Sequence, residues 1–307
     1  MFGVFLALYL YQPPADNSYA SRYLKENPTR FLQLGDYKIH YLVRGSGAPV
    51  ILVHGGGTWL YSFRNNIPSL SEHFTVYALD MPGHGYTEYL GEPAFDLDTF
   101  AEVLDGFMMA MNLSSAALVG NSWGGGWALY FAEKHPEKVR GLVLIDSSGF
   151  VGRDHWEWEI LKYPLLGEVL SKFVSRSWVE DSYRKDVFHD AGKVTDEIVS
   201  EVYKPLTFPR NRRAQYKIER GLDWKLTEAA MGSIKAPTLI IWGKQDKYVD
   251  VRSAERFRQN IRNSTVVVLD NCGHTPHEEC PAAVNELIVE FVGGSKSAST
   301  GARNMTN

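Results

Sequence analysis

Short apolar runs alternate with helix-like patterns over most of the 307-residue chain. Apolar runs bounded by turn residues predict strands, whereas apolar positions that recur every three or four residues predict helices. Strands are therefore expected at 37–43, 49–53, 75–79, 116–119, 141–145, 237–242 and 265–269. Helices are expected at 97–111, 123–134, 251–260 and 281–292. Strands interleaved with helices predict an α/β fold, in which a mostly parallel sheet is covered by helices on both faces.

This alternation stops between Ser148 and Ile234, where the chain has no strand pattern, many aromatic residues and several helix-like stretches. Because the segment interrupts the series of core strands, it is predicted to be a helical cap over the carboxyl edge of the sheet. Open α/β sheets bind their ligands at that edge. An extra packing layer without substrate contact is the alternative. The predicted organisation is a core of residues 31–147 and 235–293 with a cap at 148–234.

The two ends of the chain differ from this pattern. Residues 2–11 are apolar and uncharged, too short to span a bilayer, and not preceded by basic residues. We expect region 1–30 to be either a signal or membrane-anchor remnant, or an apolar arm that docks on the domain or on a partner. A signal or anchor remnant implies weak membrane association through residues 2–11 and a secreted or membrane-associated protein. A docking arm is compatible with a cytoplasmic protein. The tail at 294–307 is rich in small and polar residues and is expected to be flexible.

Composition excludes some partners. A formal net charge of −4 argues against nucleic acid, because phosphate binding needs a clustered basic face. The group Arg210, Arg212, Arg213 and Lys217 is more typical of a solvated surface. The only two cysteines, Cys272 and Cys280, are too few for a disulfide framework, and either is readily explained as a small buried residue.

A lone serine stands between the strand expected at 116–119 and the helix at 123–134, within Gly120-Asn121-Ser122-Trp123-Gly124. The two glycines let the strand and the helix approach closely on either side of a sharp turn. The hydroxyl of Ser122 is therefore expected to stand exposed at the edge of the sheet. Most glycine-rich turns do no chemistry, so Ser122 becomes a candidate nucleophile only if the chain also supplies a base, an acid and an anion site.

A serine hydroxyl needs an adjacent base to act as a nucleophile. His274 follows the last expected strand and is the candidate base, and Asp246 follows the strand before it and is the candidate acid that orients the histidine. His277 is the nearest competitor for the base, but it is better explained as the start of the next helix. Asp146 is the second candidate acid, since it also follows a strand, and Asp250 is weaker because it suits a helix N-cap.

The glycine-rich turn His54-Gly55-Gly56-Gly57 follows the strand at 49–53. We expect the amide of Gly56, with Gly55 second, and the amide of Trp123 at a helix N-terminus to form an oxyanion hole. The turn lacks the motifs of phosphate-binding and dinucleotide-binding loops, so nucleotide binding is not expected. His274 and His277 lack a third metal ligand nearby in sequence. Neither a metal nor a cofactor is therefore expected.

From about Phe31 to Phe291 the chain resembles the α/β-hydrolase superfamily. The resemblance implies an α/β-hydrolase fold with a cap inserted after the sixth strand, and a catalytic triad of Ser122, His274 and Asp246. It also implies that the turn containing His84 is structural. The matching motifs are His54-Gly55-Gly56-Gly57, Asp80-Met81-Pro82-Gly83-His84-Gly85, Gly120-Asn121-Ser122-Trp123-Gly124-Gly125, Gly243-Lys244-Gln245-Asp246, and Gly273-His274 with Pro276-His277-Glu278.

Within that superfamily, the first and third motifs resemble the hydrolases that cleave carbon–carbon bonds in ring-fission products. Those enzymes usually continue the first motif with Pro-Gly and have Trp after Gly-His, whereas this chain has Thr58-Trp59 and Thr275. We therefore expect a carboxylesterase whose aromatic cap favours apolar ester substrates. Carbon–carbon bond hydrolysis on the same triad is the alternative. A non-catalytic small-molecule receptor is the alternative from another class, since a fold alone does not decide function.

Overall fold

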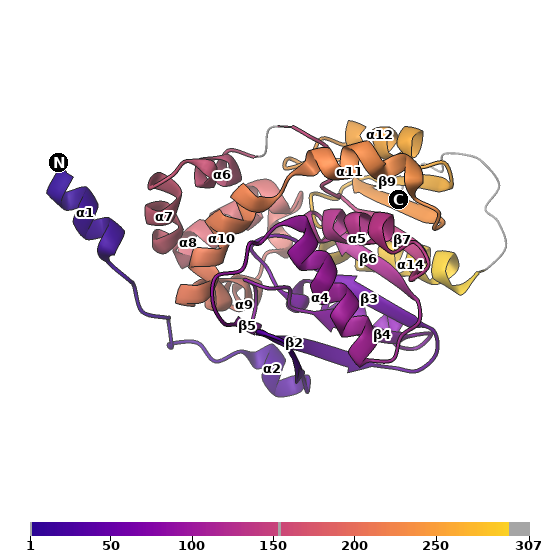
Figure 1. Cartoon of the computed structure of the whole chain (residues 1–307), viewed down its shortest axis with the longest axis horizontal. Helices are drawn as coiled ribbons and strands as arrows, with labels where there is room; N and C mark the ends of the chain where they lie inside the picture. Colours follow the sequence, from indigo (N-terminus) through magenta and orange to yellow (C-terminus); the bar gives the residue numbers. More distant parts are fainter. Residues whose placement is uncertain (1, 153–154, 295–307) are drawn as a thin grey trace.

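The computed structural model describes residues 2–152 and 155–294. Its centre is a nine-stranded sheet with the order β1-β2-β4-β3-β6-β7-β8-β9, and β5 pairs with β2 outside this order (Figure 1). The last six strands of this order, β4, β3, β6, β7, β8 and β9, run parallel to one another. The pairs β1–β2, β2–β4 and β2–β5 are antiparallel. The strands are β1 (Arg30–Leu34), β2 (Tyr37–Arg44), β3 (Pro49–Val53), β4 (Thr75–Leu79), β5 (Glu88–Tyr89), β6 (Ala116–Asn121), β7 (Val139–Ile145), β8 (Thr238–Gly243) and β9 (Ser264–Leu269). The predicted α/β fold is confirmed.

Alternate side chains of the central strands point to opposite faces of this sheet. Ile51 and Val53 of β3 join one buried apolar cluster, and Val50 and Leu52 join the other. The first cluster includes residues of α4 (Leu97–Ala110), α5 (Trp123–Lys134) and α12 (Arg252–Asn260), and the second includes residues of α3 (Ile67–Leu70) and α14 (Pro281–Gly293). Both faces of the sheet are therefore covered by helices, which explains why its central strands are continuous apolar runs.

The sequence did not predict β1 or β5. The side chains of β1 are mostly exposed, and β5 has only two residues, so neither carries the apolar run that marks a central strand. Pairing with β2 supplies the hydrogen bonds that hold both strands in the sheet. These strands lie on the side of the sheet away from β8 and β9 and take no part in the candidate site.

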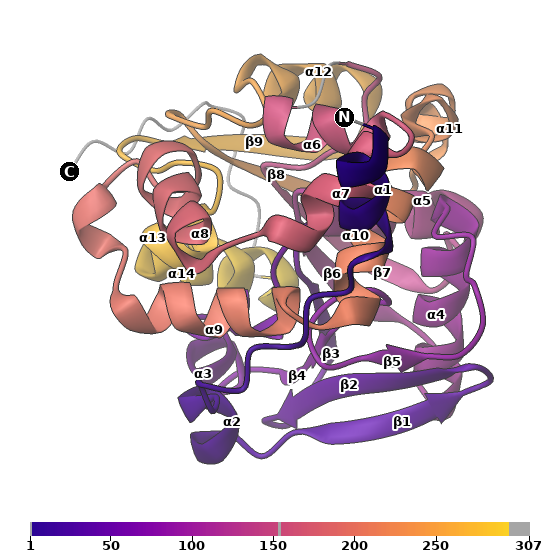
Figure 2. The ribbon, with the colours of Figure 1, turned by 90° about the vertical axis from the view of Figure 1, so that its left-hand side faces the viewer.

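Between β7 and β8 the chain forms an inserted helical segment, Trp156–Ala230, whose helices α6 to α10 lie together on one side of the sheet (Figure 2). The segment follows the sixth strand of the chain if the two-residue β5 is left out. Its helices are α6 (Trp156–Glu159), α7 (Leu166–Leu170), α8 (Arg176–Ser182), α9 (Asp196–Leu206), α10 (Pro209–Gly221) and α11 (Trp224–Ala230). Between them lie the short helical turns η2 (Ile160–Lys162), η3 (Ser171–Phe173), η4 (Tyr183–Val187) and η5 (Ala191–Lys193).

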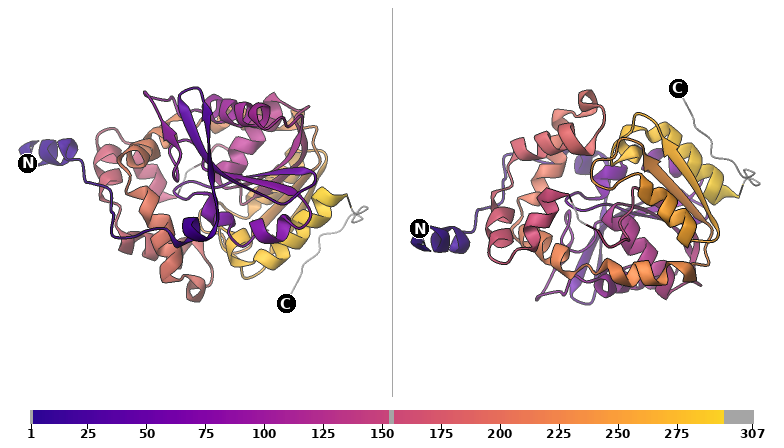
Figure 3. Two further views of the ribbon diagram at one scale, coloured as in Figure 1. Left: turned by 90° about the horizontal axis from the view of Figure 1, so that it is seen from below. Right: turned by 90° about the horizontal axis from the view of Figure 1, so that it is seen from above.

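The first residues form α1 (Phe2–Leu10), which projects beyond the inserted helical segment on the side away from the sheet (Figure 3). The chain that follows α1 is held against α9 and α10, because Arg212 donates to the carbonyl of Pro13 at 2.6 Å and the hydroxyl of Tyr19 donates to Glu201 at 2.8 Å. In the part of the chain that the structure describes, no helix combines the length and the hydropathy needed to cross a membrane. Residues 295–307 of the predicted flexible tail lie outside the described residues.

Candidate active site

Ser122 occupies a strained turn between β6 and α5. Its φ of 52° lies in the left-handed region, which residues other than glycine rarely adopt. A Cβ atom on Gly124 would lie 2.3 Å from the carbonyl oxygens of Val53 and His54, and one on Gly120 would lie 2.3 Å from the carbonyl oxygen of Gly124. Both positions therefore require glycine, because the backbones approach too closely for a side chain. The turn presents Ser122 to a cavity at the carboxyl edge of the sheet.

His274 and Asp246 meet at the same edge. The Nδ1 atom of His274 lies 2.9 Å from Oδ2 of Asp246, whose side chain is fully buried. The other carboxylate oxygen accepts the amide N–H groups of Tyr248 at 2.7 Å and Val249 at 3.1 Å. Three hydrogen bonds thus fix the carboxylate, and they leave Nε2 as the free nitrogen of the imidazole.

Ser122 and His274 line one cavity, but among the described residues no hydrogen bond joins the hydroxyl of Ser122 to the imidazole. Such catalytic contacts are often long in a free enzyme and tighten when a substrate is bound. The structure therefore brings the predicted nucleophile to the pair of base and acid, and the Ser–His hydrogen bond itself stays a prediction.

Asp146, the rival acid, lies next to this pair. Its carboxyl group is fully buried and accepts the amide N–H of Gly243 at 2.9 Å. Burial, and then the negative charge of Asp246, raise the pKa of Asp146 well above its ordinary value. Of the two carboxyl groups, Asp246 is therefore the one that bonds His274, and Asp146 is the one expected to keep its proton.

Among the described residues, only Asp146, Asp246 and His274 bring three potential metal-ligand atoms within 4.8 Å of one another. His277, which the sequence suggested as the partner of His274 in a metal pair, does not belong to this group. Two of the three residues already bond each other, and the third has a raised pKa, which favours a proton over a metal-binding carboxylate. The arrangement suits proton handling better than metal binding.

The two remaining rivals, His277 and Asp250, do not line this cavity, and neither does His84 of the turn that was expected to be structural. His277 is fully buried against Phe63, with ring centroids 4.6 Å apart, and burial lowers its pKa well below the ordinary value. His84 is buried against Trp127, and burial lowers its pKa in the same way. Asp250 bonds Arg252 at the surface, and these hydrogen bonds lower its pKa to about 2. None of the three lines the cavity that Ser122 and His274 share.

The glycine-rich turn and the start of α5 face each other across Ser122. Gly56 and Trp123 line the cavity beside Ser122, and a Cβ on Gly56 would lie 2.6 Å from the Trp123 ring. Because Trp123 is the first residue of α5, its amide has no acceptor within the helix. His54 steadies the turn, since its Nδ1 donates to the carbonyl of Gly55 at 2.7 Å and its Nε2 accepts the amide of Met81 at 3.0 Å. This geometry suits the predicted oxyanion hole.

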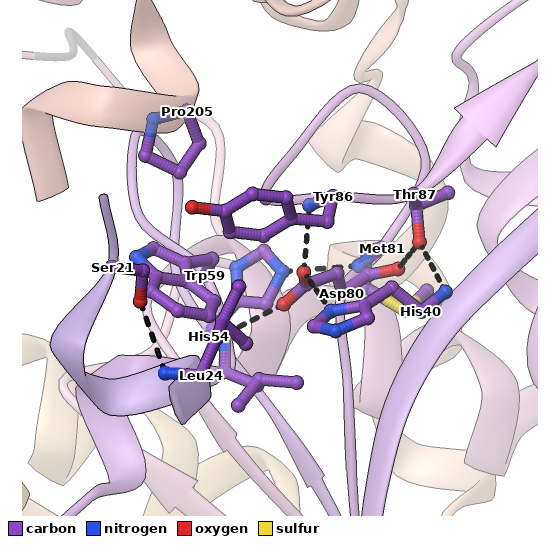
Figure 4. Close-up of polar contacts among 12 residues, drawn as sticks. Ser21, Leu24, His40, His54, Trp59, Asp80, Met81, Tyr86, Thr87 and Pro205 are labelled. Atoms are coloured by element: carbon purple, nitrogen blue, oxygen red, sulfur yellow. Dashed lines mark hydrogen bonds and ion pairs between the residues drawn. The ribbon is translucent and has the colours of Figure 1, made fainter. Parts of the chain in front are cut away.

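Asp80 ties this region together (Figure 4). One of its carboxylate oxygens accepts the amide of Leu60 at 2.8 Å, and the other accepts the amide of Tyr86 at 2.8 Å and Nδ1–H of His40 at 2.7 Å. Because Met81 in turn bonds His54, the network connects β2 and the turn at 80–85 to the glycine-rich turn. Asp80 is therefore a structural residue, as the resemblance implies.

The cavity has a volume of about 500 Å³ and is lined mainly by aromatic and aliphatic side chains of the inserted helical segment. The indole of Trp123 lines it and also contacts Trp158, with ring centroids 4.8 Å apart. Glu157 is the one carboxylate among the described lining residues, and none of those residues is lysine or arginine. Glu157 accepts the hydroxyl of Tyr248 at 2.8 Å. The cavity therefore suits an apolar ligand without negative charge.

Sequence reasoning missed two residues that position the site. The side-chain amide of Asn121 donates to the carbonyls of Ile145 and His274, both at 3.1 Å. Glu279 accepts the amides of Gly273 at 2.7 Å and Asp190 at 2.6 Å, and so links the His274 loop to the inserted helical segment. Asn121 stands inside the Gly120–Gly124 motif, which was the available signal. For Glu279, the only signal was its place just before the helix expected at 281–292.

A disulfide joins Cys272 and Cys280, which corrects the expectation of two separate buried residues. The two cysteines flank His274 and the short helix α13 (Pro276–Glu279). Pairing depends on the turn made by α13, which returns the chain until the two Cα atoms are 6.4 Å apart. Spacing alone did not reveal that turn.

Comparisons with known proteins identify the family of this fold. A family model described as alpha/beta hydrolase fold matches residues 48–281. A 2-hydroxy-6-oxo-6-(2'-aminophenyl)hexa-2,4-dienoic acid hydrolase of Metapseudomonas resinovorans is 31% identical in an alignment of length 275 that covers 86% of this chain and 90% of the relative. A meta-cleavage product hydrolase from Pseudomonas fluorescens IP01 is similar in structure, with a TM-score of 0.78 and 26% identity over 87% of this chain and 98% of that one. A bacterial membrane phospholipase A is also similar, with a TM-score of 0.74 and 26% identity over 89% of this chain and 88% of that one.

Proposed function

Because the chain belongs to the α/β-hydrolase fold family, we propose that it is a serine hydrolase that cleaves carboxylic esters of uncharged, apolar small molecules. The observation that carries the choice of substrate is the cavity charge: the described lining has one carboxylate, Glu157, and no lysine or arginine. A substrate carboxylate buried in such a cavity would lose its hydration without gaining a lysine or arginine partner. An uncharged acyl compound has no such cost.

In this proposal Ser122 attacks the ester carbonyl while the free Nε2 of His274 takes the hydroxyl proton. Asp246 holds the imidazole in the required tautomer and stabilises the imidazolium. The amides of Gly56 and Trp123 stabilise the negative charge that develops on the carbonyl oxygen. His274 then gives its proton to the leaving alcohol, and a water molecule activated by the same histidine releases the acid from Ser122.

Carbon–carbon bond hydrolysis is the second candidate, and the named relatives favour it. The relatives from Metapseudomonas and Pseudomonas are hydrolases of a dienoic acid and of meta-cleavage products. The same triad would serve that reaction. The names of these relatives and the charge of the cavity thus favour different bonds, because a dienoic acid carries a carboxylate that the described lining does not match.

One pair of assays separates the two candidates. The enzyme is given p-nitrophenyl butyrate and, separately, 2-hydroxy-6-oxo-6-phenylhexa-2,4-dienoate, and kcat/KM is compared. We expect the ester to be preferred by about 100-fold or more, since a buried, unpaired carboxylate costs several kcal/mol. A preference for the dienoate would replace ester hydrolysis by carbon–carbon hydrolysis.

The receptor alternative has its own test. A fluorophosphonate probe should label the wild-type chain at Ser122 and leave the Ser122→Ala variant unlabelled, because only an activated serine attacks the probe. Mass spectrometry of the labelled peptide locates the adduct. An unlabelled wild-type chain would favour a non-catalytic receptor.

A further inference from the structure

Exposed large apolar side chains gather on one part of the surface. Of 17 such side chains among the described residues, 13 lie in residues 4–11 and 151–173. Single exposed apolar residues are normal on a soluble protein, whereas a concentration of this kind marks an interaction surface. The first stretch is α1 with the residue after it, and the second runs through α6 and α7.

These two stretches lie side by side. The rings of Tyr11 and Phe173 stack with centroids 6.4 Å apart, and the ammonium group of Lys172 donates to the carbonyl of Tyr9. Figure 2 shows α1 next to α7. We call the surface formed by α1, Tyr11, Trp156 and residues 163–173 the apolar patch.

The apolar patch adjoins the cavity. Trp156, Leu170 and Phe173 line the cavity, and they are also 65%, 37% and 47% exposed. A molecule that enters the cavity past these side chains therefore crosses the apolar patch. The same three residues join the outer surface to the space that Ser122 faces.

The distribution of exposed residues on α1 indicates what covers the patch. Val4, Phe5 and Leu6 are consecutive and all exposed, so they point in directions about 100° apart around the helix. A protein groove covers one face of a helix, whereas lipid surrounds it, and a helix that is apolar all round suits the second. The nine residues of α1 are about 13 Å long, and this length reaches into one leaflet of a hydrocarbon core that is roughly 30 Å thick.

Aromatic residues at the rim fit the same occupant. Tyr11, Trp156 and Tyr163 are each at least half exposed, and tyrosine and tryptophan favour the boundary between water and hydrocarbon. Lys172 is the one basic residue of the patch, and its ammonium group donates to the carbonyl of Tyr9, while Arg220 beside α7 is paired with Glu168. Binding should therefore depend on apolar contacts more than on anionic lipid.

We propose that the apolar patch docks on the surface of a phospholipid bilayer and that the cavity draws its substrate from that bilayer. The claim that the cavity draws its substrate from the bilayer rests on the proposed ester hydrolysis, whereas the claim that the patch docks on the bilayer does not. Chemically, the substrate is then an ester with a long acyl chain that partitions into lipid. The aliphatic and aromatic lining of the cavity matches such a chain.

Vesicle flotation tests the docking. The full chain is mixed with phosphatidylcholine vesicles, and the fraction that floats is measured. The test variants are Phe5→Ser/Leu6→Ser/Leu8→Ser in α1 and Tyr163→Ser/Leu166→Ser beside it, none of which lines the cavity. The matched control is Met109→Ser/Leu226→Ser, because both side chains are exposed, at 67% and 49%, outside the patch. We expect partitioning to fall about tenfold or more in the test variants and to stay unchanged in the control.

Hydrolysis is measured on the same proteins. Turnover of dissolved p-nitrophenyl butyrate should be equal in all of them, whereas turnover of a long-chain ester carried in the vesicles should fall with partitioning in the test variants.

A wild-type chain that does not float, or an equal loss in the control, would overturn the docking surface. A dimer of the wild type, detected by light scattering, would also overturn it if the dimer dissociates in the α1 variant and no protein floats. A second copy of the chain would then be what covers the patch. Normal flotation without hydrolysis of either ester would leave the docking surface standing and overturn the proposed function.

Discussion

Two carboxyl groups lie behind His274, and their surroundings differ. Asp246 accepts three hydrogen bonds, one of them from His274, whereas burial and the negative charge of Asp246 raise the pKa of Asp146. Asparagine resembles a protonated aspartic acid in shape and polarity. We expect Asp246→Asn to lower kcat roughly 10⁴-fold, because the imidazole loses its orienting charge, and Asp146→Asn to lower it less than about tenfold. Steady-state kinetics on the ester measures both, and equal losses would contradict the assignment of the acid.

Glu133 in α5 gives a prediction about stability and pH. Neither of its carboxylate oxygens has a hydrogen-bond partner among the described residues, and burial raises its pKa to about 8. The folded chain thus holds this proton more tightly than the unfolded chain, whose glutamate has the ordinary value of 4.5. The contribution of Glu133 to the free energy of unfolding is therefore greatest below about pH 4.5 and is lost as the pH rises to about 8.

Urea unfolding of the wild type and of Glu133→Gln checks this prediction. The variant should gain stability relative to the wild type as the pH rises, by about 1–3 kcal/mol at pH values above 8, because glutamine avoids a buried charge. A difference between the two proteins that does not change between about pH 5 and pH 9 would contradict it.

The sequence predicted individual site residues from one property, their position directly after a core strand. Ser122 and His274 each follow a core strand at the carboxyl edge, and the structure brings both to one cavity. Position alone did not separate Asp246 from Asp146, since both follow neighbouring strands, and a single hydrogen bond to His274 distinguishes them. The contact from Asn121 to His274 joins residues 153 positions apart, which no local pattern encodes.

At the scale of elements, the disulfide closes the loop that carries His274 and α13. Cross-linking two residues eight positions apart reduces the entropy of the unfolded chain. We expect Cys272→Ser/Cys280→Ser to lower the free energy of unfolding by about 2–3 kcal/mol. We also expect kcat to fall, since the loop that orients His274 becomes less constrained. Urea unfolding and ester kinetics measure the two effects, with the wild type kept oxidised as the control, and unchanged stability would contradict the prediction.

The buried elements were the predictable ones. Strands β3, β6 and β8 are buried over almost their whole length, so their apolar runs stand out in the sequence. The exposed β1 and the two-residue β5 have no such run. The aromatic residues between β7 and β8 predicted helices without fixing their ends, because most helices there are short and are bounded by tertiary contacts.

At the scale of the whole molecule, one buried carboxylate fastens the N-terminal chain to the inserted helical segment. The hydroxyl of Tyr19 and the amide of Tyr23 both donate to Oε1 of Glu201. We expect Glu201→Ala to release this chain, so that proteases cut it about tenfold faster while the rest of the molecule resists. Glu197→Ala is the matched control, since Glu197 lies on the same helix, is largely exposed, and only approaches Arg22 at 3.8 Å. Equal cleavage of both variants would contradict the role of Glu201.

The fold class followed from the alternation of strands and helices, and the family match confirms it. The path of residues 13–23 did not follow, because those residues have no periodic pattern and contact residues about 180 or more positions further along the chain. The sequence did not predict the charge of the cavity either. It depends on which of many aromatic, acidic and basic side chains of the inserted helical segment point inward.

The bond between Cys272 and Cys280 also has a practical consequence. Reducing cytosols keep such cysteines as thiols, and oxidising compartments keep them bonded. Protein purified from a reducing host and protein from an oxidising host would then be two chemical forms that differ in the loop of the catalytic histidine. Their kinetic constants should be compared only after the thiol content of each batch has been titrated.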